Sequence, residues 1–330
     1  MGAFFSGVYD LLMGPDSRLW PVYLLVTIVI AFAIYRVRRV EQSFISWLLP
    51  KSVYFHASHI VDLKVFVVNR MFAAAGIVGY LFSSVALAQM VMNGLGGPSH
   101  LPPFHPVVIA LLLLVTADFG TYWVHRVHHE SRILWPFHAL HHSAEVMTPI
   151  TVFRRHPVYD LIATFTKGVL IGILQGVLMA LFGQAPGFAA LFGINAGYAL
   201  FNIAGANLRH THVWLSFGRW AEHIVISPAQ HQVHHSLDPR HHNKNYGEIL
   251  ALWDWIFGTL YVPQGQEQLE FGLADSKGNR LRQRHDSLTN AMLVPLKDSG
   301  RQIARLAGRI SGSPPAPAER PAQETQPAEK

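Results

Sequence analysis

The chain has 330 residues, of which 50% are hydrophobic and only 14% are charged, and its net charge is +6. Soluble domains usually carry about 25% charged residues, so the composition indicates a membrane protein with basic cytoplasmic loops, and we expect no nucleic-acid partner. The sequence contains 20 histidines and no cysteine. The lack of cysteine excludes disulfides and thiolate metal sites, so a metal would need nitrogen or oxygen ligands.

Five apolar segments are long enough, or nearly so, to cross a bilayer, which takes about 20 residues of helix. In chain order they are residues 20–35, 71–92, 104–123, 161–182 and 187–204. The first has no basic n-region or cleavage site, which favours an anchor over a signal peptide. The fourth contains Lys167, close enough to its end to snorkel. The last two could also form a re-entrant pair across a turn at residues 183–187. The segments predict an all-α fold, a polytopic membrane bundle of four to five spans.

Lysine and arginine are distributed unevenly among the loops. The loops after the first, third and fifth segments are basic, whereas residues 93–103 contain neither Lys nor Arg. Basic loops tend to stay in the cytoplasm. The pattern therefore predicts an N-terminus outside and a cytosolic helical cap, in a membrane that we expect to be the bacterial inner membrane.

Three histidine groups lie on this cytoplasmic side. Each spaces histidines three or four positions apart, which places them on one face of a helix. The groups are His125-Arg-Val-His-His129, His138-Ala-Leu-His-His142 and His231-Gln-Val-His-His235. One such group can be a polar helix face, but three on one side of the membrane predict a metal site, because neutral imidazole binds Fe, Zn, Cu and Ni.

The number of imidazoles predicts two metal ions. Eight or more candidate ligands exceed what one ion holds, since a structural zinc takes about four. Two ions would each have about four protein nitrogens and open positions, which a catalytic metal retains. A further candidate of lower rank is His156, in Phe-Arg-Arg-His-Pro before the fourth apolar segment.

Three polar residues are expected to orient these ligands, because a metal-bound imidazole usually donates its second N–H to a carboxylate or carbonyl. Asp118 lies seven residues before His125, two helical turns away on the same face. Its alternative role is to mark the end of the apolar segment. Asn245 and Asp254 follow the third histidine group and are expected to support it.

The order of these residues resembles that of the fatty acid hydroxylase/sterol desaturase superfamily. The resemblance covers residues 107–262. Its first two boxes are Asp118-x3-Tyr-Trp-x-His125-Arg-x2-His129 and Leu134-Trp-x-Phe-His138-x2-His-His142-Ser. The third box is Ser227-Pro-x2-His231-x-Val-His-His235-Ser, followed by Asn245-Tyr-Gly-x2-Leu-x2-Trp-Asp-x2-Phe-Gly-Thr259.

Members of that superfamily are integral membrane, non-haem di-iron oxygenases with a cytosolic metal site. The resemblance implies two Fe ions, which zinc could replace, with O2 as co-substrate and a lipid as substrate. It also implies a further histidine before the third box, and leaves His128 as an extra. The implied ligands are His125, His129, His138, His141, His142, His210, His231, His234 and His235, to which the position of His156 before the fourth apolar segment adds one further candidate.

The chain departs from the family pattern at three positions near these ligands. It has His212 where bacterial relatives often have Asn, Asn243 where many members have Asp, and Tyr159 where some have Glu. These differences concern the groups around the ligands rather than the ligands themselves.

Five regions are expected along the chain. They are an N-terminal segment (1–17), an N-terminal membrane region (18–106), the oxygenase-like domain (107–262), a basic C-terminal segment (263–311) and a tail (312–330). The spacing of Leu296, Ile303, Leu306 and Ile310 is typical of an amphipathic helix on a membrane surface, or of a solvated helix. The tail is rich in Pro, Ala, Glu and Gln and is expected to be disordered.

The predicted activity is O2-dependent hydroxylation or desaturation of an unactivated lipid C–H bond. Electrons would come from a separate carrier and reductase, since the sequence shows no dinucleotide fingerprint. One alternative is an ether-lipid (alkylglycerol-type) monooxygenase. Alternatives of another class are a structural di-zinc protein and a haem- or metal-handling membrane protein without turnover, although histidines beyond the apolar segments argue against a transport path.

Overall fold

The computed structural model describes residues 9, 13–14, 17–74, 84–98, 105–182 and 188–311. Within these ranges the fold is helical, with three isolated β-bridges and no β-strand, which confirms the all-α prediction. The expected tail at 312–330, the turn at 183–187 and most of the N-terminal segment lie outside the described residues.

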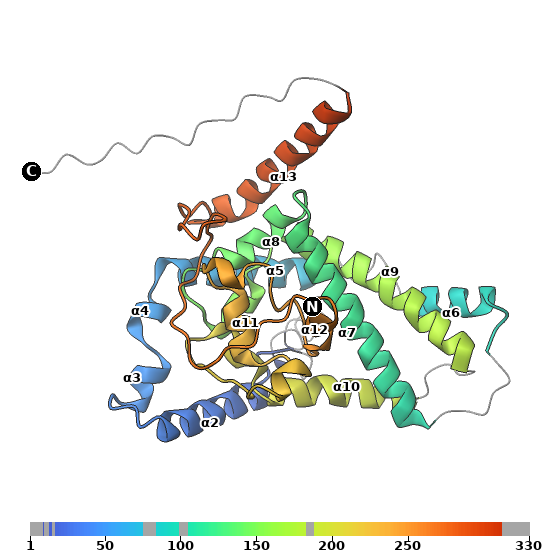
Figure 1. Ribbon diagram of the computed structural model, residues 1–330, viewed down its shortest axis with the longest axis horizontal. Coiled ribbons are helices and arrows are strands. Elements are labelled where there is room, and N and C mark those ends of the chain that lie inside the picture. The colour runs from blue at the N-terminus through green and yellow to red at the C-terminus, as the bar shows by residue number, and fades with distance from the viewer. Residues whose placement is uncertain are drawn as a thin grey trace, which may run out of the picture.

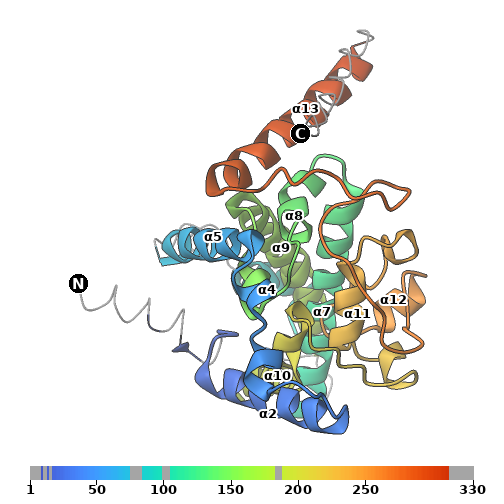
Figure 2. The ribbon, with the colours of Figure 1, turned by 90° about the vertical axis from the view of Figure 1, so that its left-hand side faces the viewer.

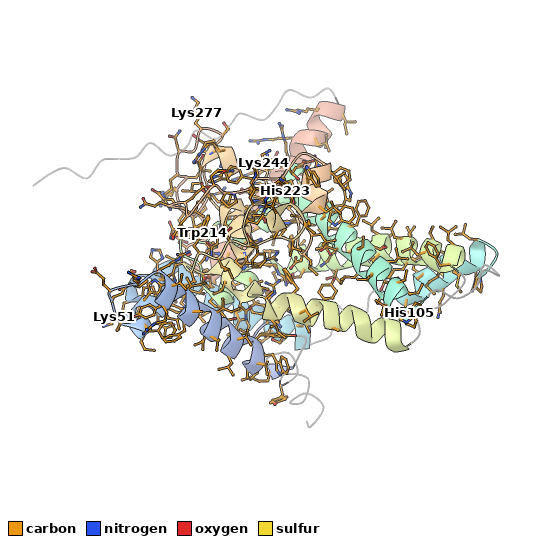
Figure 3. All side chains as sticks on the ribbon, turned by 60° about the horizontal axis from the view of Figure 1, so that its bottom comes forward. Lys51, His105, Trp214, His223, Lys244 and Lys277 are labelled. Carbon is orange, nitrogen blue, oxygen red and sulfur yellow. The ribbon has the colours of Figure 1, made fainter. Side chains whose placement is uncertain are left out.

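Two long apolar helices cross the molecule side by side (Figure 1). They are α7 (Pro106–Glu130) and α9 (Pro157–Phe182), and both are long and apolar enough to cross a membrane. His105 caps the start of α7, because its Nδ1 accepts a hydrogen bond from Val107 N at 3.3 Å. This capped end, where Figure 3 labels His105, is the opposite end of α7 from His125 and His129.

A third helix, α6 (Ser84–Gly94), packs closely on α9 through glycines. A Cβ atom at Gly172 would lie 2.8 Å from the Ser84 carbonyl oxygen, and one at Gly176 would lie 2.6 Å from that of Ala88. Small residues spaced four apart allow such close approach between membrane helices. The contact places the short apolar helix α6 against the C-terminal half of α9.

The expected bundle of four to five spans is not confirmed. Among the described helices, only α7 and α9 meet the length and apolarity of a span, while α2 (Pro21–Val37) and α10 (Phe188–Ile203) are shorter. The expected span at 71–92 falls on two helices, α5 (Ala57–Ala74) and α6, with residues 75–83 outside the described ranges. Asp62 and Asn69 of α5 are polar but buried. A hydropathy window therefore leaves out most of α5 and places the start of the apolar segment too late in the chain.

Short helices and loops form a cap at the C-terminal end of α7 and the N-terminal end of α9 (Figure 2). They are α3 (Phe44–Leu48), α4 (Lys51–Tyr54), α8 (Trp135–His142), η1 (Pro149–Phe153), η2 (Ala206–His210), η3 (Ala221–His223), α11 (Pro228–His234), η4 (Pro239–His241) and α12 (Leu252–Ile256). Both Figure 1 and Figure 2 show α2 and α10 side by side at the edge of the molecule opposite α13.

A buried ion pair holds α5 against the cap. Arg154 Nη1 lies 2.7 Å from Asp62 Oδ1, and neither side chain is exposed. The same guanidinium donates to the carbonyls of Leu140 and His285 and to Ser143 Oγ. A buried pair with its remaining donors satisfied fixes the positions of the elements that supply them.

The C-terminal helix α13 (Leu288–Ile310) begins eight residues before the expected amphipathic segment. Its first half packs on α8 and α5 and buries Ala291 and Pro295. Its second half extends away from the body of the molecule and exposes Ile303, Leu306 and Ile310 (Figure 1). The expected apolar stripe is therefore present and uncovered among the described residues.

Candidate metal centre

The three boxes lie on three different helices of the cap or its edge. His125 and His129 are one turn apart at the C-terminal end of α7, so the first box extends an apolar helix beyond its expected end. The second box forms α8, which begins with a proline at its first turn, and the third forms α11. Proline favours the first turn of a helix because its missing N–H would have no partner there.

A capping box starts α11. The hydroxyl of Ser227 accepts a hydrogen bond from Gln230 N at 3.1 Å, and Gln230 Oε1 accepts one from Ser227 N at 3.0 Å. Buried Glu222 in turn accepts the Ser227 hydroxyl proton at 2.6 Å. Reciprocal capping of this kind sets where a helix begins, and so sets the direction in which the third box points.

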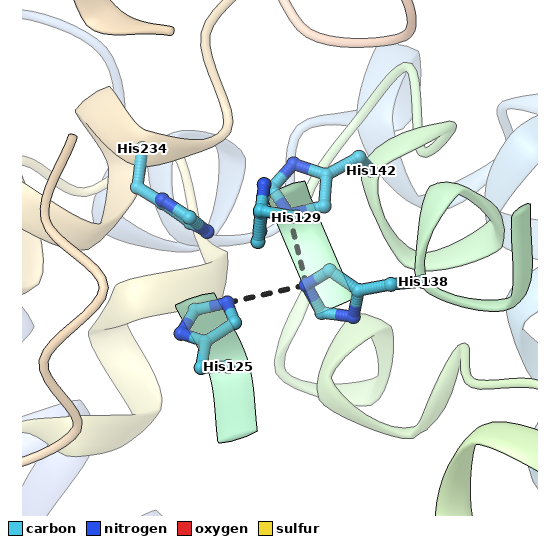
Figure 4. Close-up of side chains that lie close together, drawn as sticks. All are labelled: His125, His129, His138, His142 and His234. Atoms are coloured by element: carbon cyan, nitrogen blue, oxygen red, sulfur yellow. Dashed lines mark hydrogen bonds between the residues drawn. The ribbon is translucent and has the colours of Figure 1, made fainter. Parts of the chain in front are cut away.

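The nine histidines implied as ligands gather in two adjacent clusters, within each of which the candidate ligand atoms lie within 4.8 Å of one another. The first cluster, shown in Figure 4, consists of His125, His129, His138, His142 and His234. The second consists of His141, His210, His231 and His235. His210 reaches the second cluster from the end of η2, after α10. Among the described residues, no carboxylate belongs to either cluster.

The second and third boxes exchange their central histidines. His138 and His142 of α8 belong to the first cluster, whereas His141, between them in sequence, belongs to the second. In the third box, His234 belongs to the first cluster, whereas His231 and His235 belong to the second. The rings of His142 and His235 stack at the boundary, with their centroids 4.3 Å apart. Each helix therefore contributes to both clusters.

The spacing of the ring nitrogens fits shared metal ligation. In the first cluster, Nε2 of His138 lies 3.1 Å from that of His125 and 3.2 Å from that of His142. In the second, the corresponding contacts from His210 are 3.2 Å to His141 and 3.1 Å to His231. Metal–nitrogen bonds of about 2.0–2.1 Å place two ligands of one ion about 3.0–3.4 Å apart.

Two backbone carbonyls orient the first cluster. His125 Nδ1 lies 2.8 Å from the Tyr246 carbonyl oxygen, and His234 Nδ1 lies 2.7 Å from that of Lys244. A carbonyl only accepts, so each Nδ1 donates and each Nε2 keeps its lone pair. The buried Nε2 atoms of His129 and His234 have no hydrogen-bond partner among the described residues. Unpaired lone pairs that converge in a buried site are what a metal ion would satisfy.

The three polar residues expected to orient ligands act on the backbone instead. Asp118 has no hydrogen bond to any described histidine; its carboxylate accepts hydrogen bonds from Ile249 N, Leu250 N and Trp253 Nε1 at 3.0–3.1 Å. The direct contact expected from helical spacing is therefore wrong, because α12 and the loop before it cover this face of α7. Asp118 holds the segment that follows the Tyr246 carbonyl.

Asp254 and Asn245 hold the same loop from its other side. Asp254 accepts hydrogen bonds from Tyr246 N and Gly247 N, both at 2.8 Å, and from the Thr259 hydroxyl at 2.6 Å. Asn245 adopts a positive φ of 56° and donates through Nδ2 to the Gln230 carbonyl at 3.1 Å. Together these contacts fix the carbonyls of residues 244 and 246 against the first cluster.

Other candidate residues lie outside both clusters. His156 Nε2 lies 2.9 Å from the Met292 carbonyl and its Nδ1 accepts from Val158 N, so it is no ligand and instead joins α9 to α13. His128 Nδ1 donates to the Val124 carbonyl at 2.8 Å. His212 Nε2 donates to the Trp47 carbonyl at 2.7 Å.

The two remaining family departures lie beside the clusters. The Tyr159 ring stacks on His138 with centroids 4.8 Å apart. Asn243 accepts a hydrogen bond from the Tyr246 hydroxyl at 3.0 Å. Both side chains thus contact residues that form or orient the first cluster.

Burial keeps the clustered histidines neutral. It lowers the pKa of His235 to about 3, and with the neighbouring imidazoles it lowers those of the others in the cap well below 6.5. The latter are His138, His141, His142, His210, His231 and His234. A neutral imidazole has the free lone pair that ligation requires.

Metal-free protein is expected to lose stability as the pH falls from 7.5 to 5.5. An unfolded chain protonates its histidines near pH 6.5, whereas burial depresses the folded pKa of His235 to about 3. Below pH 6.5 the unfolded chain binds more protons, so the free energy of unfolding falls by about 1.4 kcal/mol per pH unit for each such group. Thermal unfolding across this range measures the effect, and a constant melting temperature would contradict the buried, neutral clusters.

Two cavities flank the clusters and divide their histidines. A cavity of about 600 Å³ on the side of α7, α9 and α10 is lined by His125, His138, His141, His210 and His231. One of about 180 Å³ on the loop side is lined by the other four, His129, His142, His234 and His235. The larger cavity therefore gives access to both clusters from the apolar helices.

Five cationic residues in the wall of the larger cavity are absent from the sequence prediction as site residues: Arg18, Arg70, Arg155, Lys167 and Arg209. Lys167, expected to snorkel out of its apolar segment, lies ten residues into α9 and faces this cavity. The signal available in the sequence is a charge within an apolar segment, which marks a functional candidate.

Comparison with known proteins agrees with the geometry. A family model described as fatty acid hydroxylase matches residues 110–259. The ornithine lipid hydroxylase OlsE of Rhizobium tropici is 32% identical over 191 residues, which are 57% of this chain and 53% of that protein. Human alkylglycerol monooxygenase is 32% identical over 156 residues, 47% of this chain and 31% of that protein.

A more distant relative is a fungal sterol desaturase. The Delta(7)-sterol 5(6)-desaturase erg3C of Aspergillus fumigatus is 25% identical over 198 residues, 53% of this chain and 58% of that protein. The chain thus spans less than two thirds of the length of each of these relatives, and no solved structure matches it. The family resemblance expected from the boxes is confirmed over residues 110–259, which match the fatty acid hydroxylase model.

Proposed function

We propose that the protein is a membrane-bound, non-haem di-iron oxygenase that hydroxylates or desaturates an unactivated C–H bond of a lipid. The observation that carries the proposal is the pair of adjacent all-histidine clusters within a fatty acid hydroxylase domain. Relatives named as a lipid hydroxylase, a monooxygenase and a desaturase support this chemistry.

The nine histidines would hold two iron ions, each with open positions. Bound iron would supply the reduction of O2 by two external electrons and two protons, with one oxygen atom entering the substrate C–H bond and the other leaving as water. The histidines bring no negative charge to the metals, and the carbonyls of residues 244 and 246 hold two of the rings in place.

The two cavities suggest separate roles for the two sides of the centre. We assign the larger cavity to the lipid, because it opens among α7, α9 and α10 and reaches histidines of both clusters. The smaller cavity on the loop side would leave a route for O2 or protons that the lipid does not block. Residues around the larger cavity would position the reacting carbon and exclude water from it.

We further propose four to five spans, an N-terminus outside and a cytosolic cap, in a bacterial inner membrane. Two helices that meet the criteria for a span support membrane residence. Electrons would come from a separate carrier and reductase. In this arrangement a lipid enters laterally from the bilayer, while the carrier approaches the cap from the cytosol.

Anaerobic purification of the full chain followed by metal analysis tests the proposal. We expect two Fe per chain, and we expect 18O from 18O2 in a hydroxylated lipid when reductant is supplied; a desaturated product would carry no 18O but would still require O2. Two zinc ions per chain with no O2 consumption by the iron-reconstituted protein would overturn it in favour of a structural di-zinc protein. Comparative lipidomics of cells with and without the protein would then identify the lipid.

A second candidate is an ether-lipid monooxygenase, which the 32% identity to human alkylglycerol monooxygenase favours. Hydroxylation of the carbon next to an ether oxygen would give a hemiacetal, which breaks down to an aldehyde and a free alcohol. Release of a fatty aldehyde from an alkylglycerol supplied to the protein would establish this candidate, whereas a stable hydroxylated product would exclude it for that lipid.

A further inference from the structure

The larger cavity carries an unusual concentration of positive charge. Five cationic side chains line it together with the histidines: Arg18, Arg70, Arg155, Lys167 and Arg209. Among the described residues, Glu248 is the one carboxylate that lines the same cavity. The cations come from segments far apart in sequence, before α2, at the end of α5, before and within α9, and in η2, so the fold assembles this wall.

One side of the wall is partly neutralised by Glu248. Its Oε1 lies 2.7 Å from Arg18 and 3.6 Å from Arg209, so one carboxylate serves two guanidinium groups. Burial alone would raise the pKa of Glu248, but the charges of Arg18 and Arg209 lower it to about 2. Arg209 also donates to the Glu248 backbone carbonyl and lies over the Phe201 ring, yet its buried Nε has no partner among the described residues.

The other side has less compensation. Arg155 Nε lies 3.0 Å from Asp160 Oδ1. Arg70 sits with its guanidinium 4.8 Å from the centroid of Phe153, and its buried Nε has no hydrogen-bond partner in the described part of the chain. Lys167 forms neither a hydrogen bond nor an ion pair with any described residue. On this side, Arg70 Nε and the Lys167 ammonium group are therefore donors that have no acceptor among the described residues, and both side chains line the cavity.

The charges do not cancel. The wall has five cationic side chains, and two carboxylates offset them: Glu248 in the wall and Asp160, which pairs with Arg155. The remaining net charge is +3. The clustered histidines are neutral and add no negative charge. Burying charge without a partner of opposite sign costs free energy, and an anionic ligand bound in the cavity would reduce that cost.

We propose that this cationic wall binds the anionic headgroup of the lipid substrate, a phosphate or a carboxylate, through Arg70, Arg155 and Lys167. The inference rests on the proposed oxygenase function, which it narrows to anionic lipids. Guanidinium groups bind both anions with two parallel hydrogen bonds, and an ammonium adds a compact charge. The wall and the histidines line one cavity, so the bond that reacts would lie near the headgroup rather than at the far end of a chain.

Binding measurements on the full chain in phosphatidylcholine nanodiscs test the headgroup preference. The probes are a radiolabelled phosphatidate, a fatty acid of the same chain length and the diacylglycerol with the same chains. We expect Arg155→Gln and Lys167→Met each to weaken phosphatidate or fatty acid binding about tenfold or more, the loss typical of one charge-assisted hydrogen bond. Diacylglycerol binding should not change. Arg132→Gln removes an exposed charge and should bind like the wild type.

Two further arms keep the result decisive. Arg70→Gln replaces a charge at the end of α5 and serves if a variant in or near α9 fails to fold, as judged by its elution and melting temperature. Equal affinity of the wild type for phosphatidate, fatty acid and diacylglycerol would overturn the inference. Displacement of bound phosphatidate by an equal concentration of inorganic phosphate would overturn it as well, by assigning the wall to free phosphate.

Binding needs no turnover, so the two proposals fail separately. Selective phosphatidate or fatty acid binding by a protein without O2-dependent activity would refute the oxygenase and leave the anion site. Activity on lipids without any charge preference would refute the anion site and leave the oxygenase.

Discussion

Replacing His141 by alanine is expected to remove the metal from the second cluster and leave the first loaded. His141 lies between His138 and His142 in sequence, but its Nε2 lies 3.2 Å from that of His210, in the four-histidine cluster. Its loss leaves three ligands there. Because the two metals would act on one O2 molecule, activity should fall by at least about 1000-fold.

His234→Ala, at the equivalent position of the third box, should have a smaller effect on metal content than His141→Ala. His234 belongs to the five-histidine cluster, so four ligands remain after its loss. We expect the His141→Ala protein to bind about one metal per chain, and the His234→Ala protein to bind close to two with weaker affinity at one of them. Two residues at equivalent places in two similar boxes would thus behave differently.

Metal content per chain, measured at a fixed excess of Fe(II) under anaerobic conditions, distinguishes the two variants. His223→Ala is the matched control, since this half-buried side chain contacts the Arg219 carbonyl and the Trp255 ring and belongs to neither cluster. Equal losses of metal in His141→Ala and His234→Ala would show that the boxes do not exchange their central histidines.

The set of nine clustered histidines was predictable from the sequence, but its division between two clusters was not. Helical spacing places His138, His141 and His142 near one face, and nothing in that spacing separates His141 from the other two. The separation depends on the angle at which α8 meets α11, which follows from tertiary packing. For the same reason the sequence could not show that two backbone carbonyls, rather than Asp118, orient the first cluster.

The fold was predictable where local composition decides it. The apolar runs within α7 and α9 were found because a long hydrophobic segment is a local property. The expected span at 71–92 is not confirmed: residues 75–83 are not described, and α5 begins within a polar stretch whose Asp62 pairs with Arg154, 92 residues away. Lys167 was interpreted as snorkelling for the same reason: the arginines that share its cavity come from other parts of the chain.

Gly247→Ala is expected to destabilise the protein and to weaken metal binding. A Cβ at this position would lie 2.5 Å from the Leu250 carbonyl oxygen, 2.9 Å from Asp254 Oδ2 and 2.9 Å from Ile226 Cγ1. Two of these atoms are fixed, one in the backbone and one in a buried carboxylate. Overpacking that neighbours cannot relieve costs about 1–3 kcal/mol or more, so a clear drop in melting temperature should follow.

The structural effect of Gly247→Ala should reach the metal centre through a short chain of hydrogen bonds. Gly247 N and Tyr246 N both donate to Asp254, and the Tyr246 carbonyl accepts from His125 Nδ1 at 2.8 Å. A methyl group at residue 247 would push this loop away from α7, and outer contacts of this kind are worth about 10–100-fold in metal affinity. Gly265→Ala is the control, because nothing lies within 4 Å of its added Cβ. Thermal melting and metal titration of both variants should separate them, and equal behaviour would mean that the loop does not position His125.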